Sequence, residues 1–159
     1  MAEHWYLRID GIEGESSAKG HEKAIDVLAW SWSLNQPGTH AYGGGVGSGK
    51  VSFQDFDFVA RLSTASPLLV LACATGTQHK WAELTGERSG GKTVAFVKYR
   101  LSDVLVGRVD HADDEDGVPV EEFSLRYGKF EITYTTQPAS GKPGTPVRFG
   151  WDVVQNKSF

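Results

Sequence analysis

The glycine-rich segment at residues 44–50, GGVGSGK, has the residue types and spacing of a phosphate-binding loop up to its lysine. In such loops a Ser or Thr follows the lysine and binds magnesium, and a helix begins whose N-terminus holds the phosphates. Here Val51 follows the lysine, and residues 51–58, VSFQDFDF, alternate in the manner of a strand. The sequence therefore argues against nucleotide binding at this segment.

The acidic run at residues 110–117, DHADDEDG, contains the carboxylates that calcium prefers, but not in the order of a calcium-binding loop. When Gly117 is aligned with the glycine of that loop, Ala112 takes the first position, where Asp is needed. Phe123 then takes the last position, where a bidentate Glu is needed. We expect a solvated turn here, with no metal and no cofactor.

The remaining candidates for catalysis are scattered. The histidines fall in separate segments without the paired spacing of metal ligands, at His4, His21, His40, His79 and His111. His21 and Glu22 are better explained as a turn or interface contact than as an acid and a base, and no serine has the setting of a nucleophile elbow. No catalytic residue is assigned. An enzyme stays an alternative only if the fold gathers several histidines or carboxylates in one pocket.

Composition excludes some partners. Cys73 is the only cysteine, which rules out an internal disulfide, and its apolar neighbours favour a buried thiol over a nucleophile. A net charge of −4 gives no basic surface for nucleic acid. The N-terminus alternates apolar and polar residues without the pattern of a signal peptide, and no apolar run is long enough for membrane insertion. We expect synthesis in the cytoplasm.

Periodicity predicts the elements that surround these residues. The 159 residues fit a single domain, 1–159, and 19 glycines with many aromatic residues indicate β-structure with frequent turns. Alternation predicts a mainly β fold of about eight strands, with phase changes near Gln54 and at Gly128. One short helix is expected, with Ser66 as N-cap, Pro67 at its first position and Gly76 after its end. A closed small antiparallel β-barrel with this flanking α-helix is favoured, because closure removes exposed strand edges.

The strand predicted at residues 25–35, IDVLAWSWSLN, has one bulky and one small face. Its odd positions include Ala29, Ser31 and Ser33, and this small face is either a coincidence or a surface that another molecule approaches closely. The bulky side chains are expected to face the core, at Leu28, Trp30, Trp32 and Leu34. The tryptophans are in register with other apolar residues, so core positions explain them better than a sugar-binding platform does.

Two further segments complete the chain. Residues 36–50 hold six glycines and a proline in fifteen positions, which predicts an extended glycine-rich loop that projects from the domain. Residues 147–153 predict a closing strand, with Val147, Phe149, Trp151 and Val153 in register.

Several segments in the same order carry a family likeness: GES at 14–16, HEKAIDVLAWSWSLNQPG at 21–38, GGGVGSGKVSFQDFDF at 43–58, SPLLVLACATGTQH at 66–79 and FGWDVVQN at 149–156. Together they resemble the haemolysin-coregulated protein (Hcp) family, the tube protein of type VI secretion systems. The resemblance implies a homo-hexameric ring. Such rings stack into a tube that a contracting sheath drives outward, topped by a spike protein, and effector proteins travel in the lumen.

The resemblance also implies roles for individual residues. Ala29, Ser31 and Ser33 are expected to face the lumen and its cargo. The ring-stacking loop is expected to include Pro37, Gly38, Tyr42, Gly43, Gly44, Gly45, Gly47 and Gly49. The run at 113–116 is more acidic than the corresponding family loop, and Pro37 stiffens the base of the extended loop. The implied protein is a structural subunit, not an enzyme, that is cytoplasmic when assembled and then secreted without a signal peptide. The alternative is a monomeric ligand-binding β-barrel.

Overall fold

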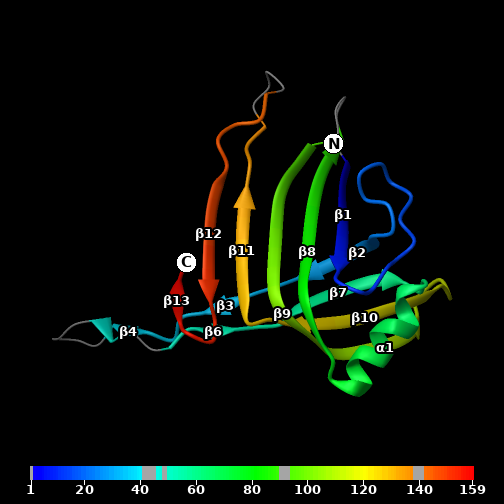
Figure 1. Cartoon of the computed structure of the whole chain (residues 1–159), viewed down its shortest axis with the longest axis horizontal. Helices are drawn as coiled ribbons and strands as arrows, with labels where there is room; N and C mark the ends of the chain where they lie inside the picture. Colours follow the sequence, from blue (N-terminus) through cyan, green and yellow to red (C-terminus); the bar gives the residue numbers. More distant parts are fainter. Residues whose placement is uncertain (1, 41–45, 48–49, 90–93, 138–141) are drawn as a thin grey trace.

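The computed structural model describes residues 2–40, 46–47, 50–89, 94–137 and 142–159 (Figure 1). In these residues, eight strands have six residues or more, as the sequence predicts. They are β1 (Ala2–Ile9), β2 (Ile25–Ser31), β7 (Phe56–Arg61), β8 (Gln78–Ser89), β9 (Val94–Asp113), β10 (Pro119–Arg126), β11 (Lys129–Tyr134) and β12 (Val147–Asp152). The shorter elements are β3 (Leu34–Asn35), β4 (Thr39–His40), β5 (Val46–Gly47), β6 (Ser52–Phe53), β13 (Lys157–Ser158) and the helix α1 (Ala65–Thr75).

The main sheet closes on itself, which confirms the predicted barrel. Strands run in the order β10-β7-β2-β1-β8-β9, and β9 pairs with β10 to complete the circle. The 20-residue strand β9 does this by using residues 97–102 to pair with β11 and residues 105–113 to pair with β10. Asp103, with a positive φ of 55°, lies between the two parts. In Figure 1, β7 and β10 consequently run across the direction of β1 and β8.

The interior of the barrel is filled by side chains. The largest of them are less than 2% exposed and include Phe56, Phe58, Phe123, Phe130, Leu7, Leu84, Leu101 and Leu125. Helix α1 packs on one end and buries Ala65, Leu69 and Ala72. The tryptophans pack around this core as predicted, at Trp5, Trp30, Trp32 and Trp151. Among the described residues, no helix is long and apolar enough to cross a membrane.

The predicted core face of the β2 segment is wrong in part, because β2 contains a bulge. The register with β7 shifts between Val27 and Ala29, so Leu28 is an extra residue and the two sides of the strand exchange there. Ile25 and Val27 face the core before the bulge, and Trp30 faces it afterwards. Leu28 is 52% exposed. Leu34 is 50% exposed because the chain has left the barrel by that point.

The helix begins earlier than predicted. Thr64 is its N-cap residue, without a side-chain capping bond, and Ser66 lies inside the first turn. The Ser66 hydroxyl accepts a hydrogen bond from the Ser63 N–H at 3.0 Å and donates to buried Glu121 at 3.1 Å. The Ser66 hydroxyl therefore binds a strand residue 55 positions away and does not cap the helix. Gly76 ends the helix as predicted, with a positive φ of 66° that favours glycine.

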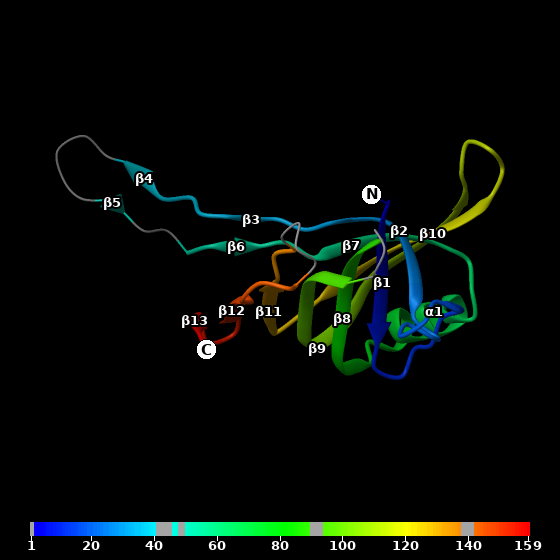
Figure 2. The same cartoon turned by 90° about the horizontal axis from the view of Figure 1, so that it is seen from above.

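The glycine-rich segment projects as predicted, but its described part is a ribbon and not an irregular loop. Strand β3 pairs with β6, and β4 pairs with β5. Figure 2 shows this ribbon extending far beyond the barrel. We call the described residues 34–40, 46–47 and 50–53 the arm. The phase change predicted near Gln54 is confirmed, because Gln54 and Asp55 separate β6 from β7.

The second half of the chain follows the predicted order, with two differences. Strands β8 and β9 form the expected antiparallel pair, and Gly128 separates β10 from β11 as expected. However, β9 continues through Asp113 into the acidic run, so only its end forms the turn. The closing strand β12 exists, but Val147 and Phe149 are 70% and 50% exposed and not buried. Strands β11, β12 and β13 form a flange on the side of the barrel opposite α1 (Figures 1 and 2).

Candidate functional site

The outer surface of four neighbouring barrel strands carries two rows of aligned residues. The first row runs from β2 to β9 through Ser31, Asp57, Ser124 and Arg108. The second row runs through Ala29, Val59, Glu122 and Asp110. Successive side chains of a strand alternate between faces, so these residues share the side opposite the core, although Ser124 is only 3% exposed. We call the surface formed by these two rows the wall face.

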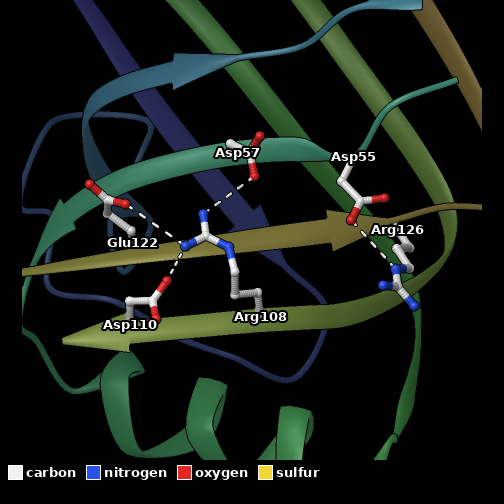
Figure 3. A network of polar contacts seen from close by, with 6 residues as sticks. All are labelled: Asp55, Asp57, Arg108, Asp110, Glu122 and Arg126. Carbon is white, nitrogen blue, oxygen red and sulfur yellow. Dashed lines mark hydrogen bonds and ion pairs between the residues drawn. The ribbon is translucent and has the colours of Figure 1, made fainter.

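Arg108 is the centre of the charges on the wall face (Figure 3). Its guanidinium lies 3.6 Å from a carboxylate oxygen of Asp57 and 3.9 Å from one of Glu122, and it also pairs with Asp110. All four side chains are between 46% and 56% exposed. Their attraction is therefore screened by water, and each pair contributes about 0–1 kcal/mol.

A second ion pair extends the wall face towards the arm. Arg126 lies 3.4 Å from Asp55, which immediately precedes β7 (Figure 3). Two open depressions mark the surface here. One of ≈ 290 Å³ is lined by residues that include Ala29, Ser31, Asp57 and Arg108. The other depression, of ≈ 390 Å³, is lined by residues that include Asp55, Arg108 and Arg126. The arrangement offers a hydrated surface whose charges are largely paired with one another.

The structure brings together two of the three residues assigned to the lumen. Ala29 and Ser31 are exposed and line the same depression. Ser33 is exposed too, but it follows β2 and its carbonyl oxygen accepts a hydrogen bond from the Gln54 N–H at 3.0 Å, so it belongs to the root of the arm. The small face of β2 is thus a real exposed surface, although it is shorter than the sequence suggested.

Sequence reasoning missed the charged neighbours of Ser31. Val104 and Val106 point into the core, and simple alternation would have sent Arg108 inward as well. The pairing of β9 with β10 shifts between Val106 and Arg108, so Gly107 is an extra residue that turns Arg108 outward. A Cβ atom on Gly107 would lie 3.1 Å from Arg126, which leaves little room for a larger residue there. A glycine inside a strand pattern was the available signal.

Three of the residues assigned to ring stacking lie in the arm. Pro37 is exposed, and the Gly38 N–H donates a hydrogen bond to the Gln36 side chain at 3.1 Å. Gly47 lies in β5 and pairs with Thr39. The other assigned residues lie outside the described part of the chain, namely Tyr42, Gly43, Gly44, Gly45 and Gly49.

The other chemical candidates have structural contacts. The ring of His21 stacks on Tyr6 at 4.2 Å and pairs with Glu87, so it fixes the loop before β2. His111 lies 2.5 Å from the buried carboxylate of Glu121. Over the residues that the structure describes, no three His, Cys, Asp or Glu side chains gather as metal ligands. Lys50 leads into the strand β6, not into a helix that would hold phosphates.

Among the described residues, α1 and the flange each present an apolar surface outside the wall face. The outer side of α1 presents Leu68, Val70 and Leu71, which are 40%, 44% and 58% exposed, and we call it the helix face. The flange presents Val147 and Phe149 on β12 and Phe159 at the chain end, which are 50–70% exposed, and we call it the flange face. Helix α1 and the strands of the flange lie on opposite sides of the barrel (Figures 1 and 2).

A comparison with known families identifies the chain. The model of the family described as "Type VI secretion system effector, Hcp" matches residues 6–134. The chain belongs to the Hcp family. Protein hcp1 of Pseudomonas aeruginosa is 38% identical over 160 residues, covering 98% of both chains.

Solved structures of Hcp proteins share the fold. Hcp1 from Salmonella typhimurium superposes with a TM-score of 0.81 at 28% identity and covers 100% of both chains. A structure described as a type six secretion system protein gives a TM-score of 0.94 at 26% identity, covering 99% of this chain and all of that one. The Hcp resemblance read from the sequence motifs is therefore confirmed, and this chain is a type VI secretion protein.

Proposed function

We propose that this Hcp protein is a structural subunit of a type VI secretion tube. Six copies form a ring, rings stack into the tube, and effector proteins occupy the lumen while sheath and spike proteins act outside it. The subunit is assembled in the cytoplasm and exported with the tube. The single observation that carries the ring is the presence of two exposed apolar faces on opposite sides of one subunit.

The helix face needs a cover from another molecule. An amphipathic surface helix turns polar residues outward, whereas a helix that is apolar all round is normally buried. Helix α1 buries Leu69 against the barrel and presents Leu68 and Leu71 on the outside. Because the removal of apolar surface from water stabilises an assembly, this helix is suited to a subunit interface.

The flange face also needs a cover from another molecule, in this case because one of its strands has an open edge. Strand β12 pairs with β11 along its full length, whereas β13 covers only Trp151 and Asp152 on the other edge. Within the described residues, the stretch from Val147 to Phe149 therefore has no strand on that second edge, whereas the Gly150 carbonyl oxygen accepts a hydrogen bond from the Phe159 N–H at 3.2 Å. Open edges with apolar side chains are templates for association.

Two different faces on one subunit predict a head-to-tail assembly. When the helix face of one copy binds the flange face of the next, every interface in the assembly is of the same kind. The copies form a closed ring if the rotation from one subunit to the next divides a full turn evenly. A six-membered ring meets this condition. The alternative of a monomeric barrel with an internal ligand has less support, because side chains fill the interior.

The mass of the particle in solution tests the ring. Gel filtration coupled to light scattering should report about six times the subunit mass of 17.3 kDa. A protein that stays monomeric at high concentration would exclude the ring.

The wall face is proposed to line the lumen, with Ala29 and Ser31 next to the cargo. Its small residues leave space, and its paired charges offer no large apolar area, so a cargo protein can bind weakly and move on. Ser31→Gln should keep the ring mass and lower the amount of effector protein that copurifies with tagged rings. Lys98→Gln, an exposed change on the part of β9 outside the wall face, is the control. Equal effector recovery with both variants would contradict the lumenal role.

A further inference from the structure

The arm leaves the barrel through a double break in its ribbon. On one side, Trp32 and Ser33 separate β2 from β3, and on the other, Gln54 and Asp55 separate β6 from β7. The last barrel pair is Ser31 with Asp57, and the first arm pair is Leu34 with Phe53. Both strands of the ribbon are thus interrupted at the same level, where one backbone hydrogen bond, from the Gln54 N–H to the Ser33 carbonyl oxygen at 3.0 Å, joins them. A hinge would be expected at this point.

One side chain from a third segment bridges the two breaks. Tyr127 lies between β10 and β11, and its hydroxyl accepts a hydrogen bond from Trp32 Nε1 at 2.7 Å. The same hydroxyl donates to the Gln54 carbonyl oxygen at 2.8 Å. A phenol can donate one hydrogen bond and accept others, so a single oxygen ties both sides of the ribbon to the barrel.

Aromatic packing fixes the bridging residues to the core. The ring of Trp32 stacks on buried Phe56 at 4.9 Å, and the ring of Tyr127 contacts the edge of Phe56 at 5.6 Å. Because the rings cannot move independently, the hydroxyl is held at a defined position between the two breaks. Trp32 and Tyr127 are half-buried, so losing the hydrogen bond between them is costly, whereas the bond to the exposed Gln54 is open to water and its loss costs less.

We propose that Tyr127 is a positioning residue, which sets the angle at which the arm leaves the barrel and so directs the arm towards an adjoining ring. The arm's part in stacking rests on the proposed tube function. The fixing of the arm root does not, because it depends only on contacts within one subunit.

Tyr127→Phe is the direct test, and Tyr99→Phe is its matched control. Tyr99 belongs to the same aromatic cluster, 5.5 Å from Phe56 and 6.0 Å from Trp32, and the described residues offer its hydroxyl no hydrogen bond. In the full-length protein at neutral pH, Tyr127→Phe should speed amide hydrogen exchange at residues 32–35 and 52–55 roughly tenfold. Tyr99→Phe should leave these rates unchanged. Equal rates in both variants would overturn the proposal.

A pH series tests whether the hydroxyl is buried in the folded protein, as its position between the two breaks requires. Burial, and to a smaller extent the charge of Asp55, raises the pKa of Tyr127 from 10.0 to about 12. Unfolding between these pH values releases a proton, so the stability that this phenol contributes is complete below pH 10 and is lost as the pH rises towards 12. Phenylalanine does not titrate. The difference in urea midpoint between the wild type and Tyr127→Phe should therefore be smaller at pH 11 than at pH 9, and an unchanged difference would contradict the buried position of the hydroxyl on which the bridge depends.

Ring stacking gives the functional measurement. Sedimentation of concentrated rings should show fewer stacked particles for Tyr127→Phe than for Tyr99→Phe, with the mass of the single ring unchanged in both. If Tyr127→Phe rings stack as well as the control rings while their arm exchanges faster, the arm angle does not direct stacking and the proposal fails on that point. If wild-type rings do not stack at all, the tube proposal fails, and the exchange rates alone decide the role of Tyr127 at the arm root.

Discussion

The wall face differs from the helix face and the flange face, which we together call the lateral faces, in whether its exposed side chains have partners within the subunit. On the wall face, Arg108 is surrounded by carboxylates of its own subunit, so the surface satisfies its charges without a partner. On the helix and flange faces, residues such as Leu71 and Phe149 remain 58% and 50% exposed and nothing in the described chain covers them. From this contrast we infer that permanent contacts would form at the helix and flange faces, whereas the wall face suits contacts that form and break.

The largest expected effect comes from placing a charge on a lateral face. Leu71→Glu or Phe149→Glu should convert rings into monomers, because burying an unpaired carboxylate at an interface costs more than one apolar contact gives, and key contacts contribute about 2 kcal/mol or more. Light scattering provides the mass. Ser31→Glu, which adds the same charge to the wall face, should leave the ring intact. Dissociation by Ser31→Glu with survival of Leu71→Glu rings would reverse the two assignments.

Mixing the two lateral variants sharpens this test. Leu71→Glu keeps an intact flange face, and Phe149→Glu keeps an intact helix face. In a head-to-tail ring these two surfaces are partners, so an equimolar mixture should form a heterodimer of about twice the subunit mass and no larger particle. If either variant dimerises alone while the mixture shows no exchange, the interface joins identical faces and the head-to-tail arrangement is wrong.

The sequence predicted the barrel better than it predicted which side chains face outward. Alternation and turn residues indicate eight strands and one helix because these signals are local. The predicted facing is wrong at Leu28 because a bulge in β2 adds one residue and exchanges the two sides of the strand. A similar bulge in β9 turns Arg108 outward, for which the sequence analysis made no prediction. The exposure of Phe149 was missed for another reason. An apolar residue in register predicts burial, but the sequence does not say whether its own chain or a neighbour provides the cover.

A smaller effect is expected when the centre of the wall face is removed. Arg108→Gln leaves the carboxylates of Asp57, Asp110 and Glu122 facing one another without a cation. We expect a loss of about 1 kcal/mol in the free energy of unfolding at low salt, because the groups are half exposed and well hydrated. Urea unfolding at 50 mM and 500 mM NaCl measures it, and the loss should shrink at high salt. A salt-independent loss would mean that Arg108 acts through packing and not through its charge.

The smallest effect is expected at the edge of the same surface. Arg126 pairs with one carboxylate, that of Asp55, at 3.4 Å, whereas Arg108 contacts three. Removing Arg126 therefore leaves one unpaired charge and no mutual repulsion, so Arg126→Gln should cost about 0.3 kcal/mol, clearly less than Arg108→Gln. Both variants should assemble as the wild type does, because neither residue lies on a lateral face. If Arg126→Gln instead disrupts rings while Arg108→Gln does not, the end of the wall face near the arm contacts a neighbouring subunit. The boundary between the wall face and the subunit interface must then be moved to include Asp55.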